Sequence, residues 1–264
     1  MQSFEYLRPT TLTEVGGMLG KMGEARPLAG GMTLIPAMKL RLAAPTALVD
    51  LSGLPELAGI KSDGKTVTIG AMTKHADVAA SADVRKLIPA LAALAGGIGD
   101  AQVRNRGTLG GSIANNDPSA CYPAAVLGLG ATVVTNRRRI AADSFFTGMF
   151  ETALAPGEIV TAVAFPVPSA AAYEKFRSPA SRYALVGVFV AKTTSGVRVA
   201  VTGAAPCVFR ASAIEAILNE KFSAETLASL RFPADGLNSD LHGDAQYRAQ
   251  LVGVLVKRAI AKLI

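Results

Sequence analysis

The chain has 264 residues, half of them hydrophobic, and a formal net charge of +7. This length suits one large domain or two to three small ones, and the apolar share is ample for a buried core. The two cysteines and two histidines are too few for a cysteine-ligated iron–sulfur cluster or a histidine-rich metal site. Any redox chemistry must therefore come from an organic cofactor or from another subunit.

The basic charge has only one tight cluster, Arg137–Arg139, beside a predicted strand over 131–135. This run favours a solvated hairpin, with a partner contact as the alternative, and no nucleic-acid-binding motif accompanies it. The amino terminus lacks a hydrophobic signal region. The uncharged stretch 118–136 contains two prolines and two glycines, which favours a helix, turn and strand over a membrane span. We expect a cytoplasmic protein without a membrane span.

The first elements predict a small parallel unit. A threonine cap before Leu12 predicts a helix over 12–19. A short extended segment, 26–29, then ends in two glycines, and a helix is predicted over 34–42. Pro45 ends that helix before a buried strand over 47–51. The resulting β–turn–α–β pattern is typical of parallel strands.

The middle of the chain predicts a hairpin followed by helices. Strands over 57–60 and 66–69 flank the turn at Asp63 and Gly64. Thr73 is predicted to cap a helix that runs to about residue 80. The remaining predicted elements are a helical run over 84–94 that Pro89 interrupts, a glycine-rich segment over 96–111, a helix over 122–127, and strands over 131–134 and 159–165.

Residues 166–169 resemble a linker and predict a domain boundary. After it we expect strands near 173–176, 185–192 and 197–202, then helices near 211–218 and 245–263. Strands followed by helices are typical of an α+β domain.

Two loops pair adjacent glycines with hydroxyl-bearing residues, at 29–34 and 107–113. Paired glycines allow successive N–H groups to point at one anion, and a following helix adds further free N–H groups. Neither loop is a Walker A loop or a dinucleotide fingerprint of the Rossmann type. Two such loops favour a ligand with two phosphates, although a plain turn is an open alternative for each.

A family resemblance extends over essentially the whole chain. The segments that show it are FEYLRPTTLTE, AGGMTLIPAMKLRL, LVDLSGLPEL, VRNRGTLGGSIANNDP, FFTGMFETAL, GEIVTAVAFP and LNSDLHGDAQYRAQLVGVLVKRA. In these segments the chain resembles the FAD-binding (medium) subunit of carbon monoxide dehydrogenase and related molybdenum hydroxylases. Xanthine dehydrogenase has a similar flavin domain.

The resemblance implies an α+β fold in three parts. Residues 1–55 would form an N-terminal α/β subdomain and residues 56–167 a middle α+β subdomain. Together these are a two-subdomain FAD-binding domain of the vanillyl-alcohol-oxidase or PCMH type. Residues 168–264 would form a C-terminal α+β domain of the CO dehydrogenase flavoprotein type.

The resemblance also implies a non-covalent FAD site. Two loops would wrap the pyrophosphate, through Ala29, Gly30, Gly31, Met32, Thr33 and Leu34, and through Thr108, Leu109, Gly110, Gly111 and Ser112. Gly110 would lie against the pyrophosphate and could need a positive φ. Lys175 would lie near the flavin and Tyr183 close to its ring. Val160 would pack near the adenine or the ring, with ordinary core as its alternative.

One position departs from the family pattern. Related chains have a second aspartate after the one that Asp117 matches, and here Cys121 stands in its place. An acceptor for a ribityl hydroxyl or a flavin group would then be missing, unless Asp117 or water compensates. We expect Cys121 to be a small buried hydrophobe, with a reactive thiol as the alternative. We expect no catalytic side chain, and a surface or capping role for His75.

The implied function is electron transfer through FAD. Electrons would come from a molybdopterin-binding large subunit through the [2Fe–2S] clusters of a small subunit, and pass from FAD to an external acceptor. The family commonly forms a dimer of heterotrimers. One alternative is a self-contained FAD-dependent oxidase of the same fold, and another is a non-enzymatic small-molecule binding module. The sequence does not reveal the organic substrate or the electron acceptor.

Overall fold

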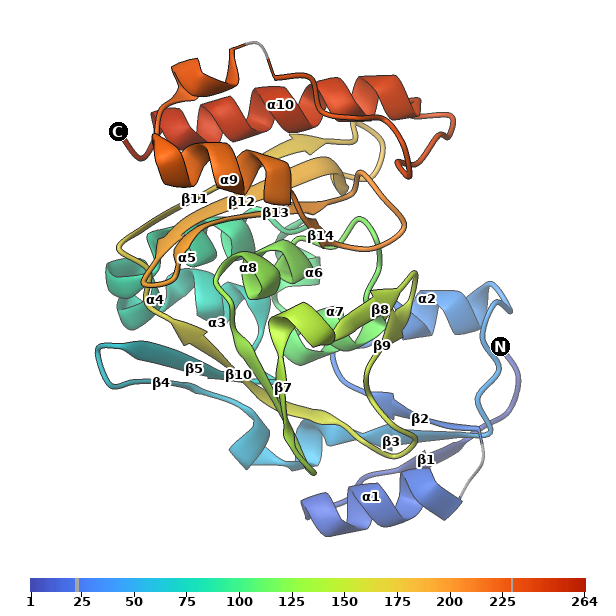
Figure 1. The fold of residues 1–264 in the computed structure, drawn as a ribbon. Coiled ribbons are helices and arrows are strands. Elements are labelled where there is room, and N and C mark those ends of the chain that lie inside the picture. The colour runs from blue at the N-terminus through green and yellow to red at the C-terminus, as the bar shows by residue number, and fades with distance from the viewer. Residues whose placement is uncertain (22–23, 229) are drawn as a thin grey trace.

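Three larger β-sheets follow one another along the chain in this computed structural model, which describes residues 1–21, 24–228 and 230–264 (Figure 1). The first sheet has the order β1 (Glu5–Leu7), β3 (Ala47–Asp50), β2 (Ala25–Leu28), and both neighbouring pairs are parallel. Helices α1 (Leu12–Lys21) and α2 (Leu34–Lys39) provide the crossovers. The central strand β3 is buried along its whole length. The predicted parallel unit is confirmed.

The second sheet is antiparallel throughout. Its order is β4 (Ile60–Ser62), β5 (Thr66–Gly70), β10 (Val160–Pro166), β6 (Thr132–Thr135) and β7 (Arg139–Ala141). On the central strand, Val163 lies in register with Ile69 on one side and Val133 on the other, and all three are fully buried. Apolar alternation along these strands therefore directs one face of the sheet into the core.

Six short helices lie on that side of the sheet. They are α3 (His75–Ala80), α4 (Ala82–Leu87), α5 (Pro89–Gly96), α6 (Ala101–Arg104), α7 (Leu109–Asn115) and α8 (Tyr122–Gly128). All except α6 contribute buried residues to its core. The predicted interruption at Pro89 is confirmed, because α4 ends at Leu87 and Pro89 is the first residue of α5. Proline suits that first position, where its missing N–H would have no intrahelical acceptor.

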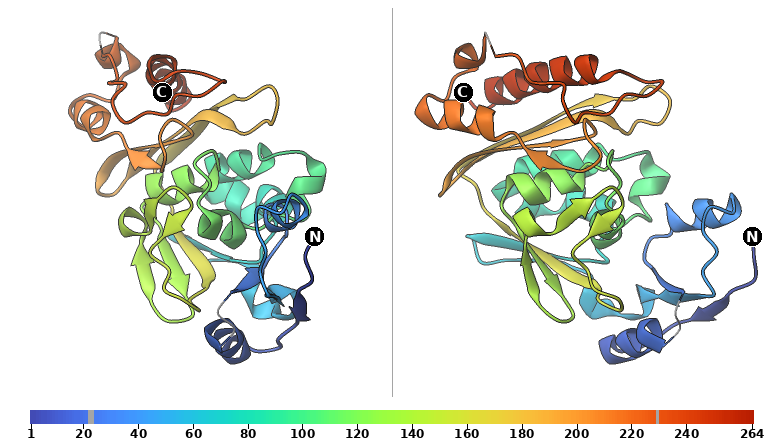
Figure 2. Two further views of the ribbon diagram at one scale, coloured as in Figure 1. Left: turned by 90° about the vertical axis from the view of Figure 1, so that its right-hand side faces the viewer. Right: turned by 45° about the vertical axis from the view of Figure 1, so that its right-hand side comes forward.

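The third sheet is also antiparallel, with the order β11 (Ala170–Arg177), β12 (Ala184–Thr193), β13 (Gly196–Thr202) and β14 (Phe209–Arg210). Helices α9 (Ser212–Glu220) and α10 (Ala245–Ala261) cover one face, and α5 and α8 lie against the other (Figure 1). Figure 2 shows the first sheet at the opposite end of the molecule from α9 and α10.

Strand β12 reads as a continuous apolar run because both of its faces are buried. Phe189 and Ala191 belong to the same core as α5 and α8. Val188 and Val190 belong to a separate core beneath α9 and α10. The third sheet thus completes the core of the α3–α8 helices as well as its own.

Short elements complete the description. Single 3-10 turns occur at Leu51–Gly53, Pro55–Leu57, Ala142–Ser144 and Ala224–Leu227, and a small ribbon pairs β8 (Phe146–Gly148) with β9 (Glu151–Thr152). Within the residues that the structure describes, no helix is long and apolar enough to cross a membrane.

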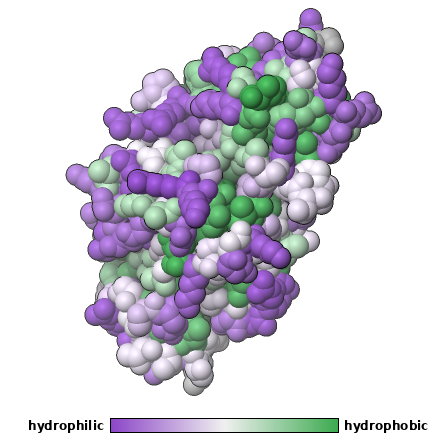
Figure 3. Space-filling view, turned by 90° about the vertical axis from the view of Figure 1, so that its left-hand side faces the viewer, coloured by the Kyte–Doolittle hydropathy of each residue, from purple (hydrophilic) through white to green (hydrophobic). Residues whose placement is uncertain are grey.

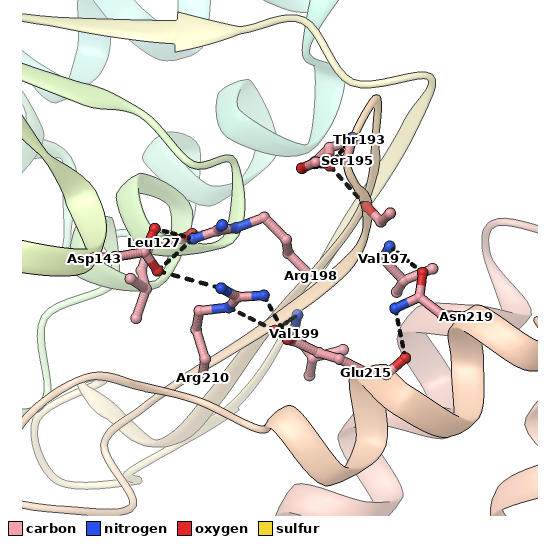
Figure 4. Close-up of polar contacts among 11 residues, drawn as sticks. Leu127, Asp143, Thr193, Ser195, Val197, Arg198, Val199, Arg210, Glu215 and Asn219 are labelled. Atoms are coloured by element: carbon pink, nitrogen blue, oxygen red, sulfur yellow. Dashed lines mark hydrogen bonds and ion pairs between the residues drawn. The ribbon is translucent and has the colours of Figure 1, made fainter.

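Polar contacts join the third sheet to α8 (Figure 4). Arg198 of β13 donates to the Leu127 carbonyl from Nη2 at 2.8 Å and from Nε at 3.0 Å, and its Nη2 lies 2.8 Å from Asp143 Oδ1. Asp143 is half exposed, so the ion pair alone contributes about 1 kcal/mol or less. Since the carbonyl ends a helix, a guanidinium there also opposes the negative end of the helix dipole.

Several predicted local features are wrong. The segment predicted as a strand over 57–60 is a 3-10 turn followed by β4, which starts only at Ile60. Thr73 does not cap α3; its hydroxyl accepts from the Gly59 N–H at 3.0 Å and donates to the Gly59 carbonyl at 3.1 Å. The glycine-rich segment contains α6 and the start of α7, because Asp100 and Thr108 cap those helices.

The basic run lies in the turn between β6 and β7, so the predicted hairpin is confirmed. Arg138 is nevertheless not simply solvated. Its Nε lies 3.0 Å from Oε1 of Glu158, a carboxylate that is buried. This hydrogen bond holds the pKa of Glu158 at about 2.

His75 was expected at the surface or as a cap, and this expectation is wrong. The residue is only 5% exposed, and its ring centroid lies 5.3 Å from that of Tyr122. Its backbone N–H donates to the Gly107 carbonyl at 3.0 Å. Burial, and secondarily the Arg104 guanidinium, lower the pKa of His75 to about 4. Among the described residues its Nδ1 atom has no hydrogen-bond partner.

We predict that His75 makes the protein lose stability in mild acid. The unfolded chain takes up a proton as the pH falls below about 6.5, whereas the folded chain resists protonation until about pH 4. The free energy of unfolding should therefore fall across this window, by roughly 3 kcal/mol at its lower end. Urea denaturation at several pH values measures the slope.

His75→Gln should flatten that slope, while His242→Gln, at an exposed histidine, should leave it unchanged. An equal slope in wild type and His75→Gln would show that His75 is not buried in its neutral form.

Candidate functional site

The first glycine loop connects β2 to α2 and presents a row of free N–H groups. Gly31 has φ of +72°, a conformation that favours glycine. The Gly31 carbonyl accepts from Ile35, which turns the chain into the helix. Within the described part of the chain, the N–H groups of residues 30–33 have no hydrogen-bond acceptor. Successive free donors in such a turn form a concave site for an anion.

The second loop uses its N–H groups internally. Leu109 donates to the Thr73 carbonyl at 3.1 Å, and Gly110 donates to the Ala71 carbonyl at 2.8 Å. The Gly111 N–H donates to Thr108 Oγ1 at 3.2 Å, which caps α7. These three donors are therefore unavailable to a ligand.

Gly110 has a different reason to be glycine from the one expected. It does not have a positive φ. A Cβ atom here would lie 2.4 Å from the Cβ of Ala71, so the residue permits close packing of α7 on the chain after β5. Leu109 and Gly110 are both buried and lie behind the surface of the loop. Gly111 and Ser112 are partly exposed and form that surface.

The two loops touch through their backbones. A Cβ at Gly30 would lie 2.2 Å from the Arg106 carbonyl oxygen, and one at Gly111 would lie 3.3 Å from the Cβ of Ala29. Any larger residue at position 30 must push the loops apart. An anion on the first loop would consequently have Gly111 and Ser112 beside it.

A second group of predicted site residues gathers around Cys121. Its expected burial is confirmed, with 5% of the residue exposed. The Lys175 Nζ atom lies 3.4 Å from Cys121 Sγ and donates to the Gly97 carbonyl at 2.8 Å. Gly97 was not among the predicted site residues, and its only signal was its place in the glycine-rich segment over 96–111. Asp117 accepts from the Ser119 N–H at 2.8 Å and so shapes the turn that leads to Cys121.

Tyr183 lies 47% exposed beside a polar cavity of about 240 Å³. Asp117, Ser178 and Arg248 are among the residues that line this cavity with it. Partial burial and the Asp117 carboxylate raise the pKa of the Tyr183 phenol. Ser178 was not predicted, and its buried hydroxyl has no hydrogen-bond partner among the described residues. The structure thus brings Asp117 and Tyr183 together.

Three further candidates differ in burial. Val160 is 5% exposed and belongs to the core of the second sheet, as its alternative interpretation stated. Met32 and Thr33 are exposed at the turn into α2, and Thr33 makes no side-chain cap. The Thr33 hydroxyl is therefore open to a ligand that occupies the first loop.

The chain is similar to proteins of known identity along its whole length. Residues 2–168 match the family described as the FAD binding domain in molybdopterin dehydrogenase, and residues 171–263 match the CO dehydrogenase flavoprotein C-terminal domain. The carbon monoxide dehydrogenase medium chain of Hydrogenophaga pseudoflava is 38% identical, covering 97% of this chain and 96% of that one. The nicotine 6-hydroxylase medium subunit of Paenarthrobacter nicotinovorans is 36% identical, covering 99% and 98%.

Solved structures agree with these matches. The reconstituted CO dehydrogenase from Oligotropha carboxidovorans has a chain that superposes with a TM-score of 0.93 at 34% identity, covering 98% of this chain and 97% of that one. Quinoline 2-oxidoreductase from Pseudomonas putida 86 gives 0.89 at 29% identity, covering 99% and 96%. The predicted α+β architecture is confirmed. The chain belongs to the family of FAD-binding subunits of molybdopterin dehydrogenases, in the branch with the C-terminal domain of the CO dehydrogenase flavoproteins.

Proposed function

We propose that this chain holds FAD without a covalent bond and passes electrons through it inside a molybdenum hydroxylase complex. The observation that carries the proposal is the row of free N–H groups in the first loop, packed directly against the second loop. Family membership supports the same cofactor. FAD, when bound, accepts electrons singly and releases them in pairs.

The two loops would bind the pyrophosphate through different groups. The N–H groups of Gly30, Gly31, Met32 and Thr33 would donate to its oxygens, and Ala29 and Leu34 would flank them. Ser112 would add a hydroxyl, with Gly111 close to the phosphate. Thr108, Leu109 and Gly110 would act from behind, by holding α7 against β5. Such binding needs no lysine, because backbone dipoles provide the positive potential.

The Cys121 group would meet the other end of the ligand. Lys175 and Tyr183 would face the flavin ring, Asp117 would accept from a nearby hydroxyl, and Val160 would close the pocket from the core. Two observations support this assignment: Asp117 and Tyr183 line one polar cavity, and Lys175 contacts Cys121. The division into parts at 1–55, 56–167 and 168–264 follows the three sheets, and a break between the two matched family regions near residue 170 supports its second boundary.

Two kinds of partner chain complete the proposed complex: a large molybdopterin-binding subunit and a small [2Fe–2S] subunit, arranged as a dimer of heterotrimers. Relatives named as medium chains or subunits support partners of this kind. Apolar side chains also stand exposed, among them Leu40 at 70% and Leu42 at 78%. On the face in Figure 3, hydrophobic residues gather near the middle and near the top. Exposed apolar patches of this kind mark association surfaces.

The purified protein or its complex should be yellow and should release FAD on acid precipitation. Free FAD in the supernatant, identified by chromatography, is the expected result because the first loop offers hydrogen bonds and no attachment atom. FMN, or flavin that stays with the precipitated chain, would contradict non-covalent FAD binding.

Gly30→Ala should sharply reduce flavin content in a folded protein. The new methyl meets the Arg106 carbonyl, separates the loops and misaligns the free donors. Loss of two or three charge-assisted hydrogen bonds, each roughly 1.5–3 kcal/mol, would weaken FAD binding about 10³-fold. Flavin titration measures this change. Gly253→Ala is the matched control, because a Cβ there meets nothing within 4 Å, and normal binding by Gly30→Ala would refute the role of the loops.

The isolated chain should not oxidise an organic substrate, but should pass electrons from reduced FAD to an artificial acceptor. Turnover should appear only when both partner chains are added. Assays of the isolated and reconstituted proteins against candidate substrates separate the two cases. Substrate-dependent flavin reduction by the isolated chain would instead establish a self-contained oxidase.

A further inference from the structure

The side-chain nitrogen of Lys175 is held by three acceptors that come from separate parts of the chain. Nζ lies 2.8 Å from the Gly97 carbonyl oxygen, 3.3 Å from the Arg182 carbonyl oxygen and 3.4 Å from Cys121 Sγ. Cys121 precedes α8, whereas Lys175 lies on β11. The amine and the thiol thus form a hydrogen bond at the place where α8 packs against the third sheet.

The three acceptors are not equivalent when the ammonium loses a proton. A carbonyl oxygen can only accept, so each carbonyl keeps one N–H of the neutral amine. The lone pair must then take the third direction, which is that of the sulfur. The fixed geometry therefore aims a nucleophilic nitrogen at Cys121 Sγ.

We propose that Cys121 and Lys175 form a reversible sulfenamide cross-link when the protein meets hydrogen peroxide. Peroxide first transfers one oxygen to the thiol, which gives a sulfenic acid and one water. The Lys175 nitrogen then attacks the sulfur, an S–N bond forms, the S–O bond breaks, and a second water leaves with the amine proton. Sulfur loses two electrons and the peroxide gains them, so one equivalent of oxidant is sufficient.

The surroundings of Cys121 suit this chemistry. The residue is 5% exposed, so it is shielded from bulky thiols while peroxide is about the size of water. The Tyr173 hydroxyl lies next to this thiol, and burial raises the pKa of that phenol well above its ordinary value. Among the described residues the hydroxyl has no hydrogen-bond partner. It can therefore remain protonated and donate to the departing oxygen.

Cys207 provides the natural comparison. It is the second cysteine of the chain, and its sulfur lies 3.6 Å from the amide nitrogen of Asn116. The lone pair of an amide nitrogen is delocalised into its carbonyl, so this nitrogen is a much weaker nucleophile than a neutral amine. The cross-link should therefore form predominantly at Cys121, although both thiols have a nitrogen neighbour.

The test treats the reduced, desalted holoprotein with stoichiometric hydrogen peroxide and maps its peptides by mass spectrometry. We expect a linked pair containing Cys121 and Lys175, lighter than the sum of the free peptides by two hydrogens, and lost on treatment with dithiothreitol. Cys207→Ser should give the same pair, and Cys121→Ser should not.

Lys175→Arg is the sharper variant, because a guanidinium keeps the charge but stays protonated and offers no nucleophilic lone pair. In this variant the linked pair should be lost, and Cys121 should acquire a dimedone adduct when the oxidised protein is unfolded in the presence of dimedone. Wild type should show little adduct, since its sulfenic acid is consumed.

Each of four results would overturn the proposal. They are equal dimedone labelling of wild type and Lys175→Arg, a disulfide between the two cysteines, a link that retains an oxygen atom, and an unreacted Cys121. None of these readouts depends on flavin turnover, so the cross-link and the proposed electron-transfer function can fail separately.

Discussion

The contact between Gly30 and the Arg106 carbonyl is the constraint on which the first site depends, because no side-chain atom fits between the two loops. It fixes where the free N–H groups of the first loop stand relative to α7. The second loop is held in turn by hydrogen bonds to Ala71 and Thr73 on its inner side. A neutral His75 fills the space behind Gly107. Tight packing behind the two loops therefore fixes the positions of the exposed N–H donors of the first loop.

The contact between Cys121 and Lys175 depends on a different arrangement, in which both faces of the third sheet are buried. Because β12 packs against α8 on one side, its neighbour β11 passes close to the turn before α8, and Lys175 reaches Cys121. Arg198 bonds to the last turns of α8 and fixes the same approach from β13. The helices between the second and third sheets thus bring residues that are far apart in sequence into contact.

The sequence predicted most elements because their signals are local. Alternating apolar strands, the turn at Gly64 and the proline at position 89 depend on neighbours a few residues away. The misjudged features depend on distant groups: Thr73 bonds Gly59 rather than its own helix, and His75 is buried beneath Gly107. From sequence alone, Gly110 suggested a positive φ. In the structure, glycine is required there because α7 packs closely on Ala71. Which N–H groups remain free is likewise a tertiary property, and no local pattern distinguishes the two loops.

Phe189, Ala191 and Ala200 of the third sheet belong to the core that α5 and α8 share with the second sheet. That core cannot close until β12 and β13 have left the ribosome, although the family boundary between the two matched regions lies near residue 170. An evolutionary domain boundary is therefore not a boundary of cooperative unfolding here. During synthesis, the apolar sides of α5 and α8 stay exposed until β12 and β13 have emerged. A nascent chain that stops near residue 170 therefore presents a surface of the kind that chaperones bind.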